Sequence, residues 1–101
     1  MVIYNVTIKV DTTIADEWLA WLKNEHIPDV IATRCFTHAT VLRLLETDDS
    51  EGPTFAVQYH ALSKSLFDEY IALHADEMRT KGFHKWGNRF IAFRSVMEVM
   101  H

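Results

Sequence analysis

Cysteine and glycine are scarce in this chain, which has one cysteine and three glycines among its 101 residues. The single cysteine, Cys35, excludes an internal disulfide and favours a reducing compartment, so we expect a cytoplasmic protein. The sequence has no Gly-rich phosphate loop, no Ser-centred nucleophile elbow and no paired-carboxylate signature. We therefore assign no catalytic residue and expect no cofactor.

Positively charged residues are also fewer than negatively charged ones. Ten Lys and Arg residues stand against 14 Asp and Glu, a formal net charge of −4, which leaves no basic surface of the kind that binds nucleic acid. The opening residues, MVIYNVTIKVD, contain neither a basic segment nor a long apolar run. We therefore expect no signal peptide, no membrane anchor, and neither nucleic acid nor membrane as a partner.

Hydrophobic residues are abundant, at 49% of the chain, which suits a globular protein and argues against disorder. The length predicts a single domain over residues 1–101. A domain of this size buries only about 60–65% of the surface of its unfolded chain, so association with a second copy would stabilise it.

The apolar pattern of the first half predicts a strand, a helix and a second strand. Strict alternation over residues 2–10 indicates the first strand. Thr13 is the predicted N-cap of the helix, and Pro28 should end that helix near Asn24 or Glu25. PDVIAT could then form one more short turn, with Pro28 at its first position. The predicted apolar stripe of this helix consists of Ile14, Trp18, Trp21 and Leu22.

Residues 36–46 and 54–62 are predicted to form a hairpin, because TDDSEGP between them has the composition of a loop. A second amphipathic helix is predicted over 63–79, capped at Ser65, with Gly82 as a possible interruption before a last helical turn at FHKW. Residues 89–100 form the closing strand. The predicted stripe of this second helix is Phe67, Tyr70, Ile71, His74 and Met78.

The order strand-helix-strand-strand-helix-strand predicts an α+β fold, a ferredoxin-like βαββαβ sandwich with both helices on one face of a four-stranded antiparallel sheet. The third strand has one fully apolar face, which should meet the helices. Its other face is mixed, and a half-apolar face of this extent is unfavourable in water. We therefore expect a homodimer that pairs sheet to sheet and encloses a partly polar cavity. The apolar face consists of Phe55, Val57, Tyr59 and Ala61.

Four stretches of the chain carry a resemblance to a known family: VIYNVTIKVD, EWLAWLKNEHIPDVIATRCF, FAVQYHA and, most specifically, HADEMRTKGFHKWGNRFIAFR. Together they resemble a family of small bacterial proteins of unknown function that is similar to the dimeric α/β-barrel superfamily. The resemblance implies a ferredoxin-like protomer that dimerises sheet to sheet. It supplies no activity, since members of the superfamily include monooxygenases, lactone isomerases and stress-responsive proteins.

His26 lies where the first helix is expected to end. One interpretation is structural: an imidazolium hydrogen-bonded at a helix C-terminus, where the helix dipole stabilises positive charge. The other places His26 at the mouth of the cavity, by analogy with a similar helix-His-x-Pro segment in several barrel families.

Two further histidines fall on the predicted hairpin. If its loop is centred near Asp49, His38 and His60 lie directly opposite each other, close enough to share a metal ion, whereas a slip of one residue would separate them. The sequence shows no third ligand beside them, so we predict no metal site. His74 is predicted to be a core residue, and Cys35 an inert buried thiol.

The remaining candidate ligand-binding residues are polar side chains on strands and one tryptophan. Arg43 and Arg94 interrupt apolar strands, and either could join Asn5 and Gln58 in the cavity to bind a small carboxylate or other anion. The alternative is that they are ion-paired or extend to solvent at the rim. Trp86 is either core or a lid. The candidate ligand-binding set is Asn5, His26, Arg43, Gln58, His60, Trp86 and Arg94.

Two classes of function remain open. The first is a binding or regulatory module that holds a small organic anion. The second is a cofactor-free isomerase or monooxygenase in which His26, His60 or Tyr4 acts as acid or base. The absence of a second catalytic group in the sequence favours the binding module.

Overall fold

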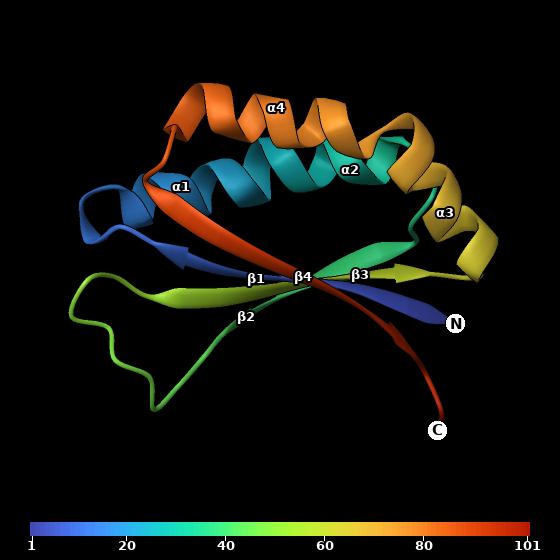
Figure 1. Cartoon of the computed structure of the whole chain (residues 1–101), viewed down its shortest axis with the longest axis horizontal. Coiled ribbons are helices and arrows are strands. Elements are labelled where there is room, and N and C mark those ends of the chain that lie inside the picture. The colour runs from blue at the N-terminus through green and yellow to red at the C-terminus, as the bar shows by residue number, and fades with distance from the viewer.

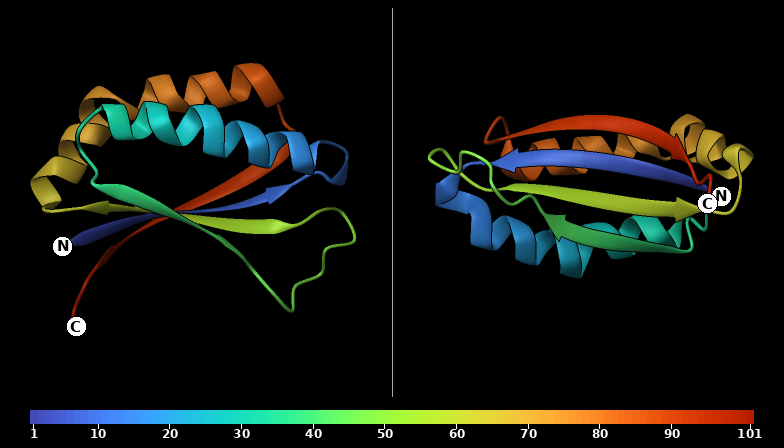
Figure 2. Two further views of the ribbon diagram at one scale, coloured as in Figure 1. Left: turned by 180° about the vertical axis from the view of Figure 1, so that it is seen from behind. Right: turned by 90° about the horizontal axis from the view of Figure 1, so that it is seen from below.

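Four strands form one antiparallel sheet in the order β2-β3-β1-β4, and the helices cover one of its faces (Figure 1). The computed structural model describes all 101 residues. Its strands are β1 (Val2–Val10), β2 (His38–Arg43), β3 (Thr54–Ala61) and β4 (Phe90–Glu98). The predicted ferredoxin-like architecture is confirmed. Figure 2 shows the opposite face of the sheet, which no helix covers.

The two faces of the sheet follow from strand periodicity. Burial alternates strictly along β1, where even-numbered residues are buried and odd-numbered ones are half-buried. On β3 the predicted apolar face packs under the helices, with Val57 1% and Ala61 0% exposed. Above it, Trp18 stacks on Phe55 with ring centroids 5.6 Å apart. This inner face is therefore the core side of the molecule.

The first helical region runs further than predicted. It comprises the 3-10 turn η1 (Thr12–Ile14), α1 (Ala15–Trp21), the π-helical turn η2 (Leu22–His26) and α2 (Ile27–Ala32). The predicted end near Asn24 is wrong. In η2 the Ile27 N–H donates to the carbonyl of Leu22, five residues earlier. This wider turn accommodates Pro28, whose ring would otherwise clash with the carbonyl four residues before it.

The second helical region is divided at His74 into α3 (Lys64–Leu73) and α4 (Ala75–Trp86), which continues without interruption through Gly82. The helical periodicity restarts at this break, so His74 is half-buried rather than a core residue and Ile71 is 38% exposed. Phe67, Tyr70 and Met78 are buried as predicted. None of the helices is long and apolar enough to cross a bilayer.

Both helix N-caps lie two residues before their predicted positions. The side chain of Asp11, not Thr13, accepts the N–H of Thr13 at the start of η1. The hydroxyl of Ser63, not Ser65, accepts the N–H of Leu66 at the start of α3. In each case the chain turns earlier than the apolar pattern suggests, because a polar residue at the end of the preceding segment caps the helix.

Candidate functional site

A cavity of about 70 Å³ lies between the inner face of the sheet and the helices. Twelve of its sixteen lining residues are hydrophobic, from β1, β3, β4, α1, η2, α3 and α4. Its volume is well below the roughly 300–1,000 Å³ of sites for drug-sized ligands and about half of a roughly 150 Å³ cavity that holds benzene, so in this conformation it encloses only part of an aromatic acid. The polar groups in its lining are those of Tyr4, His26, Tyr59, Tyr70, Arg79 and Arg94.

His26 lies in the wall of this cavity. Its ring stacks on Trp21 with centroids 4.8 Å apart, and both side chains also line an open groove between η2, α2 and α4. The Trp21–His26 stack thus separates the enclosed cavity from the groove. On the groove side, Lys81 of α4 forms an ion pair of 3.6 Å with Asp29 of α2, which joins the two helices, and another of 3.6 Å with Glu77 within α4.

The π-helical turn explains the stack. On a regular α-helix two residues five positions apart point about 140° away from each other. The extra residue in η2 widens the turn, so Trp21 and His26 come to the same face. No sequence periodicity for an α-helix could have paired them.

The pKa of His26 is lowered to about 4, chiefly by burial, with the nearby charges of Lys81 and Arg94 acting in the same direction and that of Asp29 opposing them. The predicted imidazolium at a helix C-terminus is wrong, because the helix continues past His26. His26 is half-buried, but the cavity that it lines lies between the sheet and the helices and is not the sheet-face cavity at whose mouth the sequence placed it. At neutral pH the ring is therefore an uncharged donor and acceptor.

Two arginines line the cavity beside the tyrosines. The Arg79 Nη2 donates to the Tyr4 hydroxyl over 3.3 Å. Burial raises the pKa of Tyr70 above its usual value, and the nearby charges of Arg79 and Arg94 oppose that shift. Burial also raises the pKa of Tyr59 far above its usual value, so both phenols stay protonated.

No carboxylate forms an ion pair with these cations, both of which are exposed to solvent, although the hydrogen bond to Tyr4 and the nearby charge of Asp76 raise the pKa of Arg79. The lining contains neither Asp nor Glu, and no ion pair in the structure includes Arg79 or Arg94. The cavity is therefore apolar and aromatic with two unpaired guanidinium groups, an arrangement that suits the carboxylate of a small organic acid.

Sequence reasoning did not place Arg79 among the candidate ligand-binding residues. The helical spacing contained a signal, because Arg79 is four residues after Ala75 and so borders the buried stripe of α4. That stripe consists of Ala75, Met78, Gly82 and Trp86.

Asn5, Gln58 and His60 lie on the other side of the sheet. Asn5 is the cross-strand partner of Gln58, and its side-chain amide donates to the Thr7 hydroxyl at 3.0 Å. These residues have the opposite strand parity from the buried ones, so they face outward. Within one protomer they cannot join His26 and Arg94, and the single cluster expected from the sequence is not formed.

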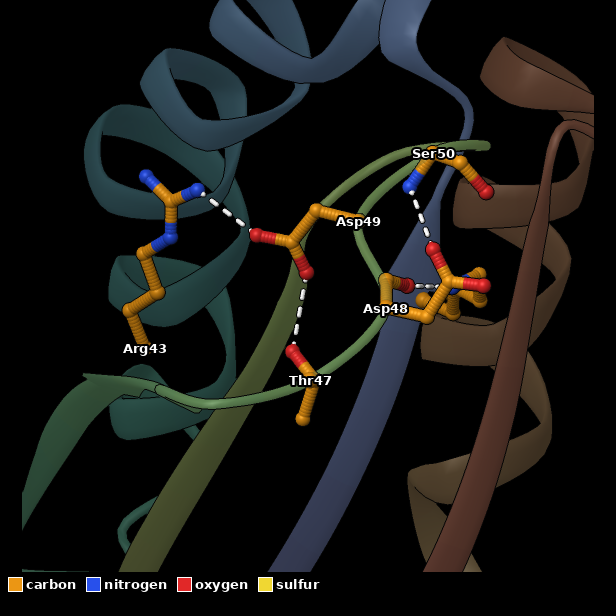
Figure 3. Close-up of polar contacts among 6 residues, drawn as sticks. Arg43, Thr47, Asp48, Asp49 and Ser50 are labelled. Carbon is orange, nitrogen blue, oxygen red and sulfur yellow. Dashed lines mark hydrogen bonds and ion pairs between the residues drawn. The ribbon is translucent and has the colours of Figure 1, made fainter.

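Arg43 and Trp86 are also away from the cavity lining. Arg43 points into the β2–β3 loop and pairs with Asp49 at 3.0 Å, as Figure 3 shows. This matches the ion-paired alternative for Arg43. Trp86 is 8% exposed and packs edge-on against Trp21 at 6.0 Å, which makes it a core residue rather than a lid.

The hairpin register is the one centred near Asp49. His38 and His60 are direct cross-strand partners, and their rings stack with centroids 4.1 Å apart and planes within 9° of parallel. No group of three or more His, Cys, Asp or Glu side chains is arranged to hold a metal ion. Cys35 is buried as predicted, and its thiol lies 3.4 Å from a Glu69 carboxylate oxygen, with burial raising its pKa.

Comparisons with known proteins agree with the fold. A family model described as "Domain of unknown function (DUF4286)" matches residues 1–100. No curated protein matches the chain. Among solved structures, a dimeric ferredoxin-like protein from an uncultured marine organism is similar at a TM-score of 0.75 and 11% identity, covering 99% of this chain and 95% of that one.

Two further solved structures have activities or families in their names. A point mutant of SnoaB, a cofactor-independent oxygenase from Streptomyces nogalater, is similar at a TM-score of 0.69 and 9% identity over 99% of this chain and 94% of that one. An ethyl tert-butyl ether degradation family protein from Bacillus halodurans is similar at a TM-score of 0.67 and 13% identity, over 99% of this chain and 100% of that one. At these identities the likeness establishes the fold alone.

Proposed function

Given that the chain belongs to the DUF4286 family, whose function is unknown, we propose that it is a cytoplasmic, homodimeric binding protein that holds a small organic anion in the cavity between sheet and helices. One observation carries the proposal: Arg79 and Arg94 line an otherwise apolar cavity without any carboxylate partner. A bound carboxylate would supply the missing counter-charge through charge-assisted hydrogen bonds.

The residues that line the cavity also restrict the shape and size of the ligand beyond its carboxylate. Tyr59, Tyr70 and Trp18 offer aromatic and apolar contacts, which favour a flat or compact hydrocarbon body. The small volume excludes a large cofactor in this conformation. The His26 ring at the wall is uncharged at neutral pH and can donate one hydrogen bond to the ligand.

The test is a binding series of small carboxylates, from acetate to benzoate, each compared with its neutral amide. We expect the acids and not the amides to raise the melting temperature, by an amount that grows with concentration. Arg79→Gln and Arg94→Gln should each weaken benzoate binding roughly tenfold, about 1.4 kcal/mol.

Arg43→Gln is the matched control, because that arginine is outside the cavity and paired with Asp49. It should leave benzoate affinity unchanged. Equal binding of benzoate and benzamide, or an equal loss of affinity in Arg43→Gln, would contradict the proposal.

A cofactor-independent enzyme is the second candidate, favoured by a neutral His26 in the cavity wall of a fold shared with an oxygenase. A base with a pKa of about 4 is weak at neutral pH, and general bases work best with a pKa near the working pH. This favours binding without turnover. Oxygen uptake with a bound hydroxyaromatic, abolished in His26→Gln but retained in Arg43→Gln, would establish the enzyme instead.

A further inference from the structure

On the outer face of the sheet, His38 and His60 form a pair that the cavity does not involve. They are direct partners in the β2–β3 ladder, so both side chains leave the same face of the sheet at the same level. Their near-parallel rings, 4.1 Å apart, are held by two neighbouring strands rather than by a flexible loop.

We propose that His38 and His60 bind one divalent transition-metal ion of the Cu²⁺, Ni²⁺ or Zn²⁺ class through one ring nitrogen each. Neutral imidazole is a preferred ligand of these ions. Metal–nitrogen bonds are about 2.0–2.1 Å long, so two nitrogens on one ion are at most about 4.2 Å apart. The observed 4.1 Å spacing is between ring centroids, and because the nitrogen lone pairs lie in the ring planes, the two rings must turn out of their parallel stack to place two nitrogens on one ion.

The hydrogen bonding of the pair supports this site. His60 Nε2 is buried and has no hydrogen-bond partner, a rare condition that calls for an unseen partner such as an ion. His38 Nδ1 lies 2.8 Å from the Thr37 hydroxyl, an outer contact that orients the ring and leaves its other nitrogen for a ligand.

Two protein ligands leave open positions on the ion. No third His, Cys, Asp or Glu of the same chain completes the set, so water or an added ligand fills the remainder. The ion selectivity then follows ligand type: Cu²⁺ should bind more tightly than Ni²⁺ or Zn²⁺, and Mg²⁺, which prefers oxygen ligands, should not bind.

The experiment is calorimetric titration of tag-free protein with NiCl₂ at a pH of about 7.5, with MgCl₂ as the negative control. We expect one Ni²⁺ per chain, and at least a tenfold loss of affinity in His38→Ala and in His60→Ala. His84→Ala is the matched control, since His84 is exposed on α4, in the helical layer. It should bind Ni²⁺ as the unmodified protein does.

A second readout guards against variants that fold poorly. Zinc added to the unmodified protein should shift the NMR ring resonances of His38 and His60 together and leave those of His84 in place. Nickel binding that survives in the His38→Ala/His60→Ala double variant, or that falls equally in His84→Ala, would overturn the site. The results of the metal titrations do not depend on whether the cavity binds an anion.

Discussion

His26 shows how a single side chain acquires its chemistry from its position. In the sequence it follows an acid and precedes Ile27 and Pro28, which gives no indication of burial. In the structure it stacks on Trp21, and the loss of solvent around its ring disfavours the charged form. Its proton affinity is therefore a property of the packed helices rather than of the local sequence.

This burial predicts a pH-dependent stability. The pKa of His26 is about 4 in the folded chain and 6.5 for the unperturbed residue, so between these values the unfolded chain binds more protons. The free energy of unfolding should fall as the pH drops from about 6.5 to about 4, by roughly 3 kcal/mol from this residue. Below a pH of about 4, protonation of His26 should cause no further change in the free energy of unfolding.

The measurement is urea unfolding at a series of pH values, with an NMR titration of the His26 ring. His26→Gln should remove most of the pH dependence across that interval. A measured His26 pKa close to that of a free imidazole would contradict the burial argument.

At the scale of elements, α4 owes part of its contact with the first helical region to Gly82. A Cβ added there would lie 3.6 Å from the Trp21 ring and 3.8 Å from Phe90, which are ordinary contact distances. Gly82→Ala should therefore stabilise α4 by about 0.5–1 kcal/mol through helix propensity. Thermal unfolding measures this change.

A larger side chain at the same position should act on the cavity. Gly82→Leu would press on Trp21 and occupy space that Gly82 leaves in the lining, so we expect a loss of about 1–3 kcal/mol and no benzoate binding. Unchanged benzoate affinity in a folded Gly82→Leu protein would show that the ligand binds elsewhere.

The β2–β3 loop depends on a different glycine. Gly52 has a φ of +140°, and a Cβ there would lie 1.7 Å from the Val10 carbonyl oxygen, so Gly52→Ala should cost at least about 3 kcal/mol. Gly87 is the comparison, since it has a φ of +61° and a Cβ there would meet nothing within 4 Å. Because its ψ of −133° lies outside the left-handed helical region, Gly87→Ala should cost about 1–3 kcal/mol from backbone strain alone. Chemical denaturation of both variants tests the difference.

At the scale of the whole molecule, the sheet face that no helix covers is the main exposed apolar surface. Phe93 and Ile91 on β4 are 68% and 58% exposed, and the face also carries Met97 and Leu42 at 40% and 41%. Exposed apolar area of this kind is typical of an interface, and a small domain gains stability from covering it. A second copy is the occupant we propose, and one structural neighbour is described as dimeric.

Phe93→Glu tests this arrangement. In a single chain the side chain is mostly exposed and the change should cost little, whereas in a sheet-to-sheet dimer it would bury an unpaired charge. Light scattering should give a dimer mass for the unmodified protein and a monomer mass for Phe93→Glu. Phe83→Glu is the control, since Phe83 is 64% exposed on α4, in the helical layer, and should leave the dimer intact.

The sequence by itself determined the order of the elements, the inner face of the sheet and the burial of Cys35. The first two depend on local periodicity, because strand alternation selects the buried face. The sequence left two hairpin registers open, and only the paired strands decided that His38 lies opposite His60.

Only the tertiary structure decided which polar residues meet. Arg94 and His26 lie far apart in the chain, yet they share a cavity with Arg79 because β4 and α4 pack beside η2, while Asn5 and Gln58 face away on the other side of the sheet. A π-helical turn changes the helical period locally, so it cannot be inferred from a pattern that assumes 3.6 residues per turn. Contacts between segments distant in sequence depend on the packing of the whole chain, and they determine what the cavity can bind.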